Sequence, residues 1–409
     1  MSGRMTEIVV TGLGLVTPAG IGVAANWEQV SAGRPAAAPD PALAGAAVEF
    51  SCRVPGFDAG ALLGRALALR ADRFVQLALV AAREAVADAG LDPATWDGAR
   101  VGVVLGNSLG GSATLERQHA ELMGGDVDDV SPLTVPMTMV NMVAGYVAMD
   151  RGARGPVLVT ATACASGTTA IGVARDLLRA GACDVVLAGG TESALTPLVL
   201  AGLRRMGALS GRADDPAAAS RPFDAERDGF VPAEGAGVLV LERRSDAVAR
   251  GARQRAVVLG FGASADAYHL TAPDPEGRGL ERALRAALAD AGLGADDVDH
   301  VNAHGTSTPL NDVTEAAALR RVLGRGAAVT STKGVTGHTL AAAGAIEAGY
   351  AVLALEHGLV PPTANLKNLD PAVDLDVVAD GARQVPLRVA VSTSLGFGGM
   401  NAALALAAA

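Results

Sequence analysis

The sequence predicts an α/β protein built from two similar halves. Apolar segments typical of buried strands alternate with segments whose apolar residues recur at helical spacing. Some strand segments, such as 184–188, are continuously apolar, which is typical of parallel sheets covered on both faces. The sequence Ala-Asp-Ala-Gly-Leu ends a predicted helix at 87–91 and again at 289–293. This recurrence indicates an internal duplication.

The first half, residues 1–250, supplies one set of elements in a fixed order. Residues 8–14 form an apolar strand that ends in a glycine turn, and a helix is expected over 70–88. A short polar loop then leads to a strand at 101–106 that stops at glycine. We expect the segment 210–228, rich in Asp, Arg, Ala and Pro, to be an ordered surface loop.

The second half, residues 251–409, repeats that order. A strand at 257–262 is followed by a helix at 280–290 and a strand at 301–305. Two further helices, 165–180 in the first half and 339–356 in the second, are apolar on most sides. Such helices are buried between layers, so we expect the two halves to pack around them.

The composition excludes several classes of protein. The chain has 409 residues, 50% of them hydrophobic and only 3% aromatic, with three cysteines. These values exclude intrinsic disorder and a disulfide scaffold. No apolar segment reaches the roughly 18 residues that a membrane helix needs. The first ten residues lack the features of a signal peptide. We therefore expect a cytoplasmic protein with no membrane partner.

The charges argue against nucleic-acid binding. The formal net charge is −10, and no basic tract of five or more residues occurs. Only two of the 33 basic residues are lysines, Lys333 and Lys367, in a chain that otherwise uses arginine. A lysine in such a background suggests a position where a compact ammonium is needed.

Cys164 is the strongest candidate nucleophile. An apolar strand runs into it from residue 157, and a helix is predicted to start directly after it. At a helix N-terminus, unpaired N–H groups and the helix dipole favour the thiolate. We therefore expect a functional thiolate at Cys164, whereas Cys52 and Cys183 are expected to be small buried core residues.

Two histidines have comparable settings. His304 follows a predicted strand and precedes a polar turn, and His338 precedes a buried helix. Open α/β sheets bind ligands at such positions, so Cys164 and both histidines could meet between the halves. Together they could form a zinc site, but no local ligand pair supports it, and we expect no metal. The remaining histidines have weaker contexts, with surface or packing roles expected for His119, His300 and His357.

Four motifs in order resemble those of the β-ketoacyl-ACP synthases, most closely the elongating type of bacterial fatty-acid synthesis. They are Ala163–Gly167 around Cys164, His304–Thr308, Lys333–His338 and Gly396–Asn401. Further similarity at Arg221–Phe230 and Asp266–His269 extends the resemblance over nearly the whole chain. The resemblance implies a thiolase-like, duplicated five-layer α/β/α/β/α fold, in agreement with the repeat.

The resemblance also implies a condensing mechanism without a cofactor. Cys164 would carry the acyl chain, and the backbone N–H groups of Cys164 and Phe397 would form an oxyanion hole. His304 and His338, as neutral imidazoles, would stabilise the enolate left when malonyl-ACP loses CO2. Lys333 would support the site electrostatically.

The same resemblance assigns expected roles to other residues. Glu347 would pair with Lys333, with Asp312 and Glu315 as supporting residues, and Gly396, Phe397 and Gly398 would form a gate. The expected substrate contacts are Thr306, Thr308, Leu109, Thr134, Met137 and His269, and the expected basic patch for an acidic acyl carrier protein is Arg65, Arg70 and Arg73.

The family implies a dimer, for which Thr134 and Met137 would reach the partner's pocket. A homodimer and a heterodimer with a chain-length-factor-like subunit both remain open. A type II polyketide ketosynthase would share every motif. The departures at Pro232-Ala233, Leu395 and 341–343 bear on the substrate and not on the reaction.

Three related activities fit the sequence less well. A thiolase needs a second cysteine near the C-terminus, and no cysteine follows Cys183. A chain-length factor lacks the nucleophile that Cys164 supplies. Initiating synthases use a Cys-His-Asn set, whereas this chain has histidine at both positions, His304 and His338.

Overall fold

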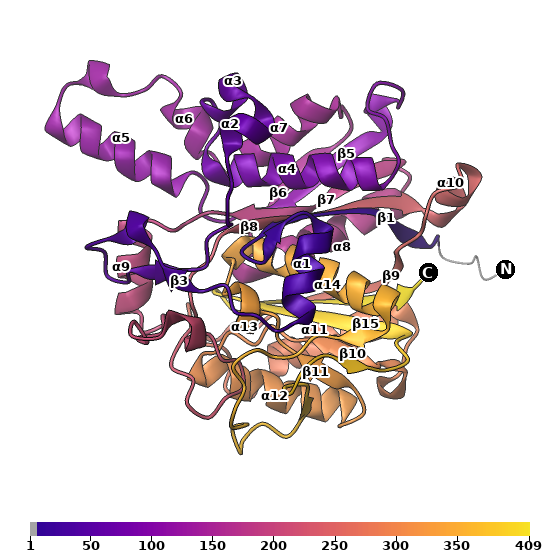
Figure 1. The fold of residues 1–409 in the computed structure, drawn as a ribbon. Helices are drawn as coiled ribbons and strands as arrows, with labels where there is room; N and C mark the ends of the chain where they lie inside the picture. Colours follow the sequence, from indigo (N-terminus) through magenta and orange to yellow (C-terminus); the bar gives the residue numbers. More distant parts are fainter. Residues whose placement is uncertain (1–5) are drawn as a thin grey trace.

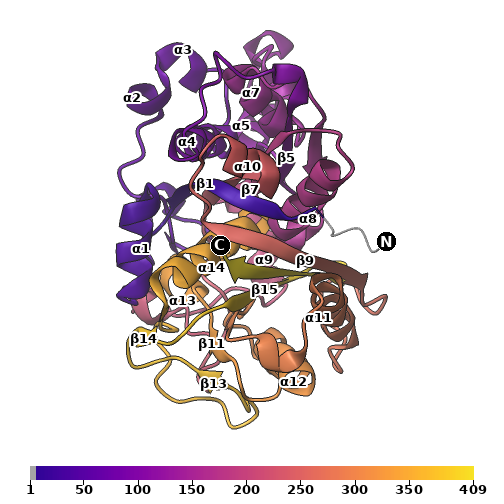
Figure 2. The same ribbon diagram turned by 90° about the vertical axis from the view of Figure 1, so that its right-hand side faces the viewer.

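The computed structural model describes residues 6–409, so the first five residues of the N-terminal segment considered above lie outside it. The principal strands of the described chain form one continuous hydrogen-bonded path, whose two halves are called the first and the second sheet below. These two sheets enclose central helices and are covered by helices on their outer faces, which gives five layers (Figure 1). Figure 2 shows the same layers from the side. The predicted thiolase-like α/β/α/β/α arrangement is confirmed.

The first sheet has five principal strands. From its edge next to the second sheet, two antiparallel pairings are followed by two parallel ones. In that order the strands are β1 (Ile8–Thr17), β8 (Gly235–Arg243), β7 (Val185–Glu192), β5 (Val101–Gly106) and β6 (Val157–Thr160).

The second sheet repeats this order and these orientations. Two antiparallel pairings are again followed by two parallel ones. The strands are β9 (Ala256–Ala265), β16 (Met400–Ala408), β15 (Val389–Gly396), β10 (His300–Asn302) and β11 (Ala328–Thr330), with β13 (Asp376–Val377) added at the edge. The predicted duplication is therefore visible in the topology, and the sheets join where 8–10 of β1 pair with 256–258 of β9.

The covering helices occupy equivalent places in the two halves. On the outer faces lie α4 (Arg73–Asp88) with α7 (Met142–Arg151), and α11 (Arg278–Ala291) with α12 (Pro309–Leu323). Between the sheets lie α8 (Ser166–Arg179) and α14 (Ala343–His357). Residues 343–355 are all buried, which confirms the prediction of a central helix.

The repeated Ala-Asp-Ala-Gly-Leu sequence has the same structural role in both halves. Asp88 accepts a hydrogen bond from the backbone N–H of Leu13 in β1, and Asp290 accepts one from Phe261 in β9. Both strands bulge just before this contact. The two aspartates thus fix each outer helix against a bulged strand, which accounts for the repeat.

Glycines allow these helices to approach the strands closely. A Cβ added at Gly14 would lie 1.9 Å from the carbonyl oxygen of Ala81, and one at Gly262 would lie 2.1 Å from that of Ala283. Any side chain at either glycine would therefore push the outer helix away from its sheet.

The structure differs from the sequence-based boundaries in two places. The helix predicted over 339–356 begins at Ala343, because residues 340–342 form a short 3₁₀ turn. The segment 210–228 is only partly a surface loop, since residues 219–224 are buried. There Arg221 pairs with buried Asp224, whose carboxylate also accepts the N–H groups of residues 226, 367 and 368.

The other elements are short or lie at the periphery, and α5 and α6 form an arm at the top left of Figure 1. Within residues 6–409 no helix combines the length and apolarity needed to cross a bilayer. The remaining elements are α1 (Val23–Ser31), α2 (Ala59–Leu63), α3 (Arg65–Ala68), α5 (Ser112–Gly124), α6 (Thr134–Thr138), α9 (Pro197–Arg205), α10 (Arg244–Ala249), α13 (Lys333–Thr336), β2 (Gly20–Ile21), β3 (Ala38–Pro39), β4 (Phe50–Ser51), β12 (Leu359–Val360) and β14 (Arg383–Gln384).

Candidate active site

A cavity of about 430 Å³ opens between the two halves at the carboxyl ends of the strands. Cys164, His304, His338 and Phe397 all line it. The cysteine follows β6 in the first half, whereas the other three follow strands of the second half. The duplication therefore places the candidate groups at the junction of the halves, as the sequence predicts.

Cys164 lies on a strained turn between β6 and α8. Ala163 has a positive φ of 48°, which is uncommon for a residue with a side chain. The Ser166 hydroxyl stabilises the turn, since it accepts the N–H of Thr162 at 2.9 Å and donates to the Ala163 carbonyl at 2.6 Å. The backbone N–H groups of Phe397 and of Cys164 itself act on the thiol and favour its ionised form.

The expectation of a thiolate in the free protein is wrong. Burial raises the pKa of Cys164 to about 11, although the charge of Lys333 and the two N–H groups act in the opposite direction. Desolvation outweighs the helix N-terminus here. The resting group is therefore a thiol, and its proton must leave as the sulfur attacks.

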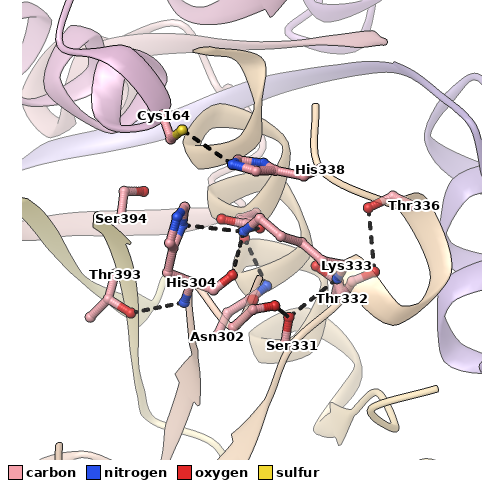
Figure 3. A network of polar contacts seen from close by, with 12 residues as sticks. Cys164, Asn302, His304, Ser331, Thr332, Lys333, Thr336, His338, Thr393 and Ser394 are labelled. Carbon is pink, nitrogen blue, oxygen red and sulfur yellow. Dashed lines mark hydrogen bonds and ion pairs between the residues drawn. The ribbon is translucent and has the colours of Figure 1, made fainter. Parts of the chain in front are cut away.

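The backbone around His338 fixes which ring nitrogen carries the proton. The N–H of Leu340 donates to Nδ1 at 3.3 Å, so the neutral ring has its hydrogen on Nε2. That Nε2 lies 3.1 Å from the Cys164 sulfur (Figure 3). Burial, with the charge of Lys333, holds the pKa of His338 well below its usual value, so the ring is neutral.

His304 also carries its hydrogen on Nε2, but here a side chain fixes the tautomer and not a backbone N–H. The Lys333 ammonium lies 3.3 Å from Nδ1, and an ammonium can only donate, so Nε2 again carries the hydrogen. Burial first, then Lys333 and His338, hold the pKa of His304 well below normal. The two rings are perpendicular with centroids 5.2 Å apart, so the cavity contains two neutral N–H donors beside one thiol.

Lys333 is held in place by three contacts. Its Nζ donates to the carbonyl oxygen of His304 at 2.6 Å and contacts the His304 ring (Figure 3). It also pairs with the Glu347 carboxylate. Both side chains of the ion pair are buried. Burial raises the pKa of Glu347 to about 7, and the charge of Lys333 limits the rise. The predicted pairing is therefore present.

The ligand atoms of Cys164, His304 and His338 lie within 4.8 Å of one another, close enough for a metal ion. Histidines that bind zinc usually donate their second ring N–H to an acceptor. Here the second nitrogens face donors, the N–H of Leu340 and the ammonium of Lys333. The surroundings of the trio therefore do not suit a metal ion.

Glu315 and Asp312 support the backbone around His304. Glu315 accepts the N–H groups of His304 and Gly305 at 2.8 and 2.7 Å. Asp312 accepts the N–H of Ser307 at 3.2 Å. Both carboxylates are fully buried, so they fix the loop and not the substrate, in the supporting place that the sequence predicted.

Thr306 and Thr308 lie at the mouth of the cavity. Both line it, and their hydroxyls are 2.9 Å apart. Thr308 also accepts the N–H of Asn311 at 3.4 Å as the N-cap of α12. Their position fits the predicted substrate contacts.

The glycine-rich loop after β15 brings Phe397 beside the cysteine. A Cβ at Gly396 would lie 2.5 Å from the carbonyl oxygen of Thr162 and 3.2 Å from the nitrogen of Cys164, so only glycine fits. Gly398 has φ +83°, and its N–H donates to the Leu270 carbonyl at 2.7 Å. Phe397 is half-buried against the cavity, in the place expected for a gate.

His269 does not line the cavity, contrary to its expected role as a substrate contact. Its side chain is exposed, and Nδ1 accepts the N–H groups of Thr271 and Ala272. Residues 271–273 do line the cavity. His269 thus shapes the loop that forms the wall, and sequence reasoning missed Thr271 itself.

The other histidines and cysteines have the predicted structural roles. His119 is exposed, whereas His300 is buried with Nδ1 2.8 Å from the Ala328 carbonyl oxygen. His357 stacks on Trp27. The two remaining cysteines, Cys52 and Cys183, are buried.

Leu109, Thr134 and Met137 lie outside the main cavity. Leu109 is exposed, Thr134 and Met137 are half-buried in α6, and the Thr134 hydroxyl contacts Gln118. In the single chain they are therefore not part of the cavity at Cys164. Further exposed apolar side chains lie on α5 and α6 or directly after α6, including Leu115, Val135 and Met139.

The three predicted docking arginines fall into two groups. Arg65 and Arg70 are exposed. Arg73 instead forms a bidentate ion pair with buried Glu234, so the structure contradicts its place in a free basic patch. Sequence reasoning missed Arg204 and Arg205, which are exposed at the end of α9, just before Met206 in the cavity wall. The only sequence signal for them is that two basic residues occur together in the last turn of a helix.

Comparison with known proteins agrees with this geometry. Residues 5–247 match the N-terminal domain of β-ketoacyl synthases, and 255–367 match the C-terminal domain. The chain belongs to the β-ketoacyl synthase family. It is thereby an acyltransferase of the ketosynthase type.

Individual relatives cover the whole length of the chain. It is 45% identical to 3-oxoacyl-[acyl-carrier-protein] synthase 2 of Synechocystis sp., over 98% of this chain and 97% of that one. The ishigamide ketosynthase/chain length factor is 35% identical with a TM-score of 0.93, over 99% and 100% of the two chains. A type II polyketide ketosynthase, solved with its acyl-carrier protein and bound to the hexaketide, is 33% identical with a TM-score of 0.91, over the same shares.

Proposed function

We propose that this ketosynthase condenses an acyl group held on Cys164 with malonyl-ACP and so lengthens the chain by two carbons. The main support for this proposal is that the Cys164 thiol lies beside two neutral imidazoles, His304 and His338, which both have their hydrogen on Nε2. No cofactor is needed for this reaction, since the substrates bring the reactive thioesters.

In the first half-reaction, the Cys164 sulfur attacks the thioester carbon of acyl-ACP. The carbonyl oxygen gains negative charge, which the backbone N–H groups of Cys164 and Phe397 beside the sulfur would stabilise. The bond to the pantetheine sulfur breaks, and the proton of the thiol ends on that sulfur. The acyl group is left on Cys164 as a new thioester.

In the second half-reaction, the thioester oxygen of malonyl-ACP accepts the Nε2–H groups of His304 and His338. Loss of CO2 leaves its electron pair in an enolate, which these two hydrogen bonds stabilise. The enolate carbon attacks the carbonyl carbon on Cys164, and the C–S bond breaks with its electron pair on sulfur. The sulfur takes up a proton from water, which restores the thiol, and β-ketoacyl-ACP leaves. Lys333 fixes His304 and adds a positive charge behind it. Thr306 and Thr308 at the mouth fit the pantetheine arm.

The acyl carrier protein is the proposed partner at the cavity mouth. Acyl carrier proteins are acidic, whereas this chain has a net charge of −10, so docking needs local positive charge. Arg204 and Arg205 supply it directly beside the mouth. Arg65 and Arg70 are exposed further away in sequence and stay in the proposed patch.

A dimer is supported by the open edge of the first sheet. Among residues 6–409, β6 pairs with β5 alone, and Val157 and Leu158 are 39% and 43% exposed. Such an edge strand with apolar side chains is a template for pairing with another chain. A partner there would cover Leu109 and Met137 and enclose an acyl pocket.

Two pathways fit this active site. We favour fatty-acid elongation, for which the similarity to the 3-oxoacyl-[acyl-carrier-protein] synthase 2 of Synechocystis sp. is the support, with a homodimer as the expected assembly. A type II polyketide role with a chain-length-factor-like subunit is the alternative, supported by two structural relatives. Leu395, a departure from the family pattern, lines the cavity and bears on this choice. A cytoplasmic location stays a prediction.

Mass spectrometry of the intact protein tests the reaction. We expect wild-type protein incubated with acyl-ACP to gain one acyl group, and Cys164→Ala to gain none. An acyl adduct on Cys164→Ala would overturn the assignment. Product analysis with malonyl-ACP and acyl-ACPs of graded length, with and without a candidate partner chain, then separates the two pathways.

A further inference from the structure

An ion pair between a buried carboxylate and a partly exposed arginine lies behind the site and has no place in the mechanism above. Glu234 is completely buried, and the Arg73 guanidinium donates to both of its carboxylate oxygens at 2.6 Å. Burial alone would raise the pKa of Glu234, but the hydrogen bonds and charge of Arg73 bring it below the ordinary value. The pair is therefore ionised at neutral pH.

The segment that ends at Glu234 holds His338 through its backbone. The N–H of His338 donates to the Val231 carbonyl at 2.8 Å, and its carbonyl accepts the N–H of Ala233 at 3.1 Å. The ring of Phe230 packs edge-on against the imidazole, with centroids 5.0 Å apart. Any shift of residues 230–233 must therefore move the His338 ring.

Glu234 fixes this segment against three other parts of the fold. Its carboxylate accepts the N–H of Val54 at 3.1 Å and the hydroxyl of Ser193 at 2.8 Å, besides the two bonds from Arg73. Residues 232–234 also pair with Cys52 on the side away from His338. The carboxylate is thus the point where these segments meet.

We propose that Arg73 and Glu234 are positioning residues that hold the Nε2–H of His338 at the correct place for malonyl-ACP decarboxylation. The proposal rests on the function proposed above for His338. It also explains why Arg73 is engaged within the fold and not in a docking patch. Loss of the pair lets residues 231–233 relax and turns the His338 hydrogen bond away from the developing enolate.

The chain offers a matched control at the other end of β8. Arg250 binds Glu242 through Nε and Nη2, at 2.8 and 2.6 Å, in the same bidentate way. The exposures match, since Glu242 is 2% and Arg250 27% exposed, against 0% and 29% for Glu234 and Arg73. Eight residues of strand, roughly 26 Å, separate the two carboxylates.

The experiment measures the two half-reactions separately in Glu234→Gln, Arg73→Met and the control Glu242→Gln. Acyl transfer from acyl-ACP is followed by the mass of the protein, and decarboxylation by CO2 released from malonyl-ACP. We expect decarboxylation to fall roughly 10-fold to 100-fold in the Glu234 and Arg73 variants, with acyl transfer reduced much less. The control should keep both rates within twofold, whatever its loss of stability.

Two further variants keep the test decisive if a single change prevents folding. Arg73→Lys keeps the charge and should recover part of the decarboxylation rate that Arg73→Met loses. The double variant Arg73→Met/Glu234→Gln leaves no unpaired buried charge and should fold while still decarboxylating slowly.

Three outcomes would decide against the proposal. They are equal losses in both half-reactions, a decarboxylation loss of the same size in Glu242→Gln, and a double variant with the wild-type rate. If wild-type protein itself neither accepts an acyl group nor releases CO2, the proposed function fails, and that result is distinct from any difference among the variants.

Discussion

Replacing Lys333 by Met tests how much its positive charge contributes to enolate formation. The ammonium is 1% exposed and touches no part of the cavity that substrate would fill, so its effect must pass through His304 and through space. Methionine is similar in length and removes the charge. The Nδ1 of His304 then loses its donor, and the ring can take either neutral tautomer.

The distance from Lys333 to the enolate sets the size of the effect. The Nζ lies 3.3 Å from Nδ1 of His304. Adding the width of the ring and a hydrogen bond of about 2.9 Å places the enolate oxygen about 8 Å from the charge. With an effective dielectric constant of about 20, the attraction is about 2 kcal/mol, which corresponds to a rate decrease of roughly 30-fold.

The assay is CO2 release from malonyl-ACP, with acyl transfer to Cys164 measured beside it. Lys333→Met leaves Glu347 without its partner, and the pKa of that carboxyl, already raised to about 7 by burial, rises further. The control Lys333→Met/Glu347→Gln removes both charges and should show the same loss of decarboxylation at every pH from about 6 to 8. A double variant that decarboxylates within threefold of wild type would refute the electrostatic role of Lys333.

Three further predictions concern the turn at Cys164 and the sheet beneath it. Gly396→Ala places a methyl group against the Thr162–Cys164 turn and should slow acyl transfer, measured as acyl adduct, by roughly 100-fold. The control Gly145→Ala, whose added methyl group meets open space, should leave the rate unchanged. Equal rates of acyl transfer in the two variants would contradict the close approach at Gly396. Alkylation of Cys164 by iodoacetamide should still accelerate with pH above about pH 9, because burial raises its pKa to about 11, and a plateau below about pH 8 would show a thiolate instead. Burial raises the pKa of Glu192 from 4.5 to about 7, so the stability that this group contributes is complete below about pH 4.5 and is lost as the pH rises through 7. Glu192→Gln removes this dependence, so the difference in unfolding free energy between wild type and the variant should shrink by about 3 kcal/mol between about pH 4.5 and 8. A difference that stays constant with pH would show that Glu192 titrates normally.

The sequence was sufficient for the duplicated fold and for the central trio. Both depend on local patterns, because the Ala-Asp-Ala-Gly-Leu repeat ends each outer helix and Cys164 lies directly between a strand and a helix. The pairing of Lys333 with Glu347 came from the family resemblance. It could not be read from spacing, since the two residues lie on α13 and α14 across a 3₁₀ turn.

The parts that sequence reasoning missed depend on contacts between distant segments. Arg73 looks like one member of a basic helix until Glu234, 161 positions away, is placed beside it. The protonated state of Cys164 likewise depends on how completely other segments exclude water, which outweighs the local helix N-terminus. Arg204 becomes a candidate for binding the acyl carrier protein only because α9 ends at the cavity mouth.

The matching strand orders of the two halves mean that Cys164 and Lys333 lie in corresponding connections. The first follows β6 and leads into α8, and the second follows β11 and leads into α14. Two identical copies would place two equal reaction centres about their symmetry axis. In this chain the connection after β6 supplies the nucleophile, and the connection after β11 supplies the positive charge and an imidazole. Both connections therefore contribute to one reaction centre. Substitutions in either connection therefore act on the same reaction centre.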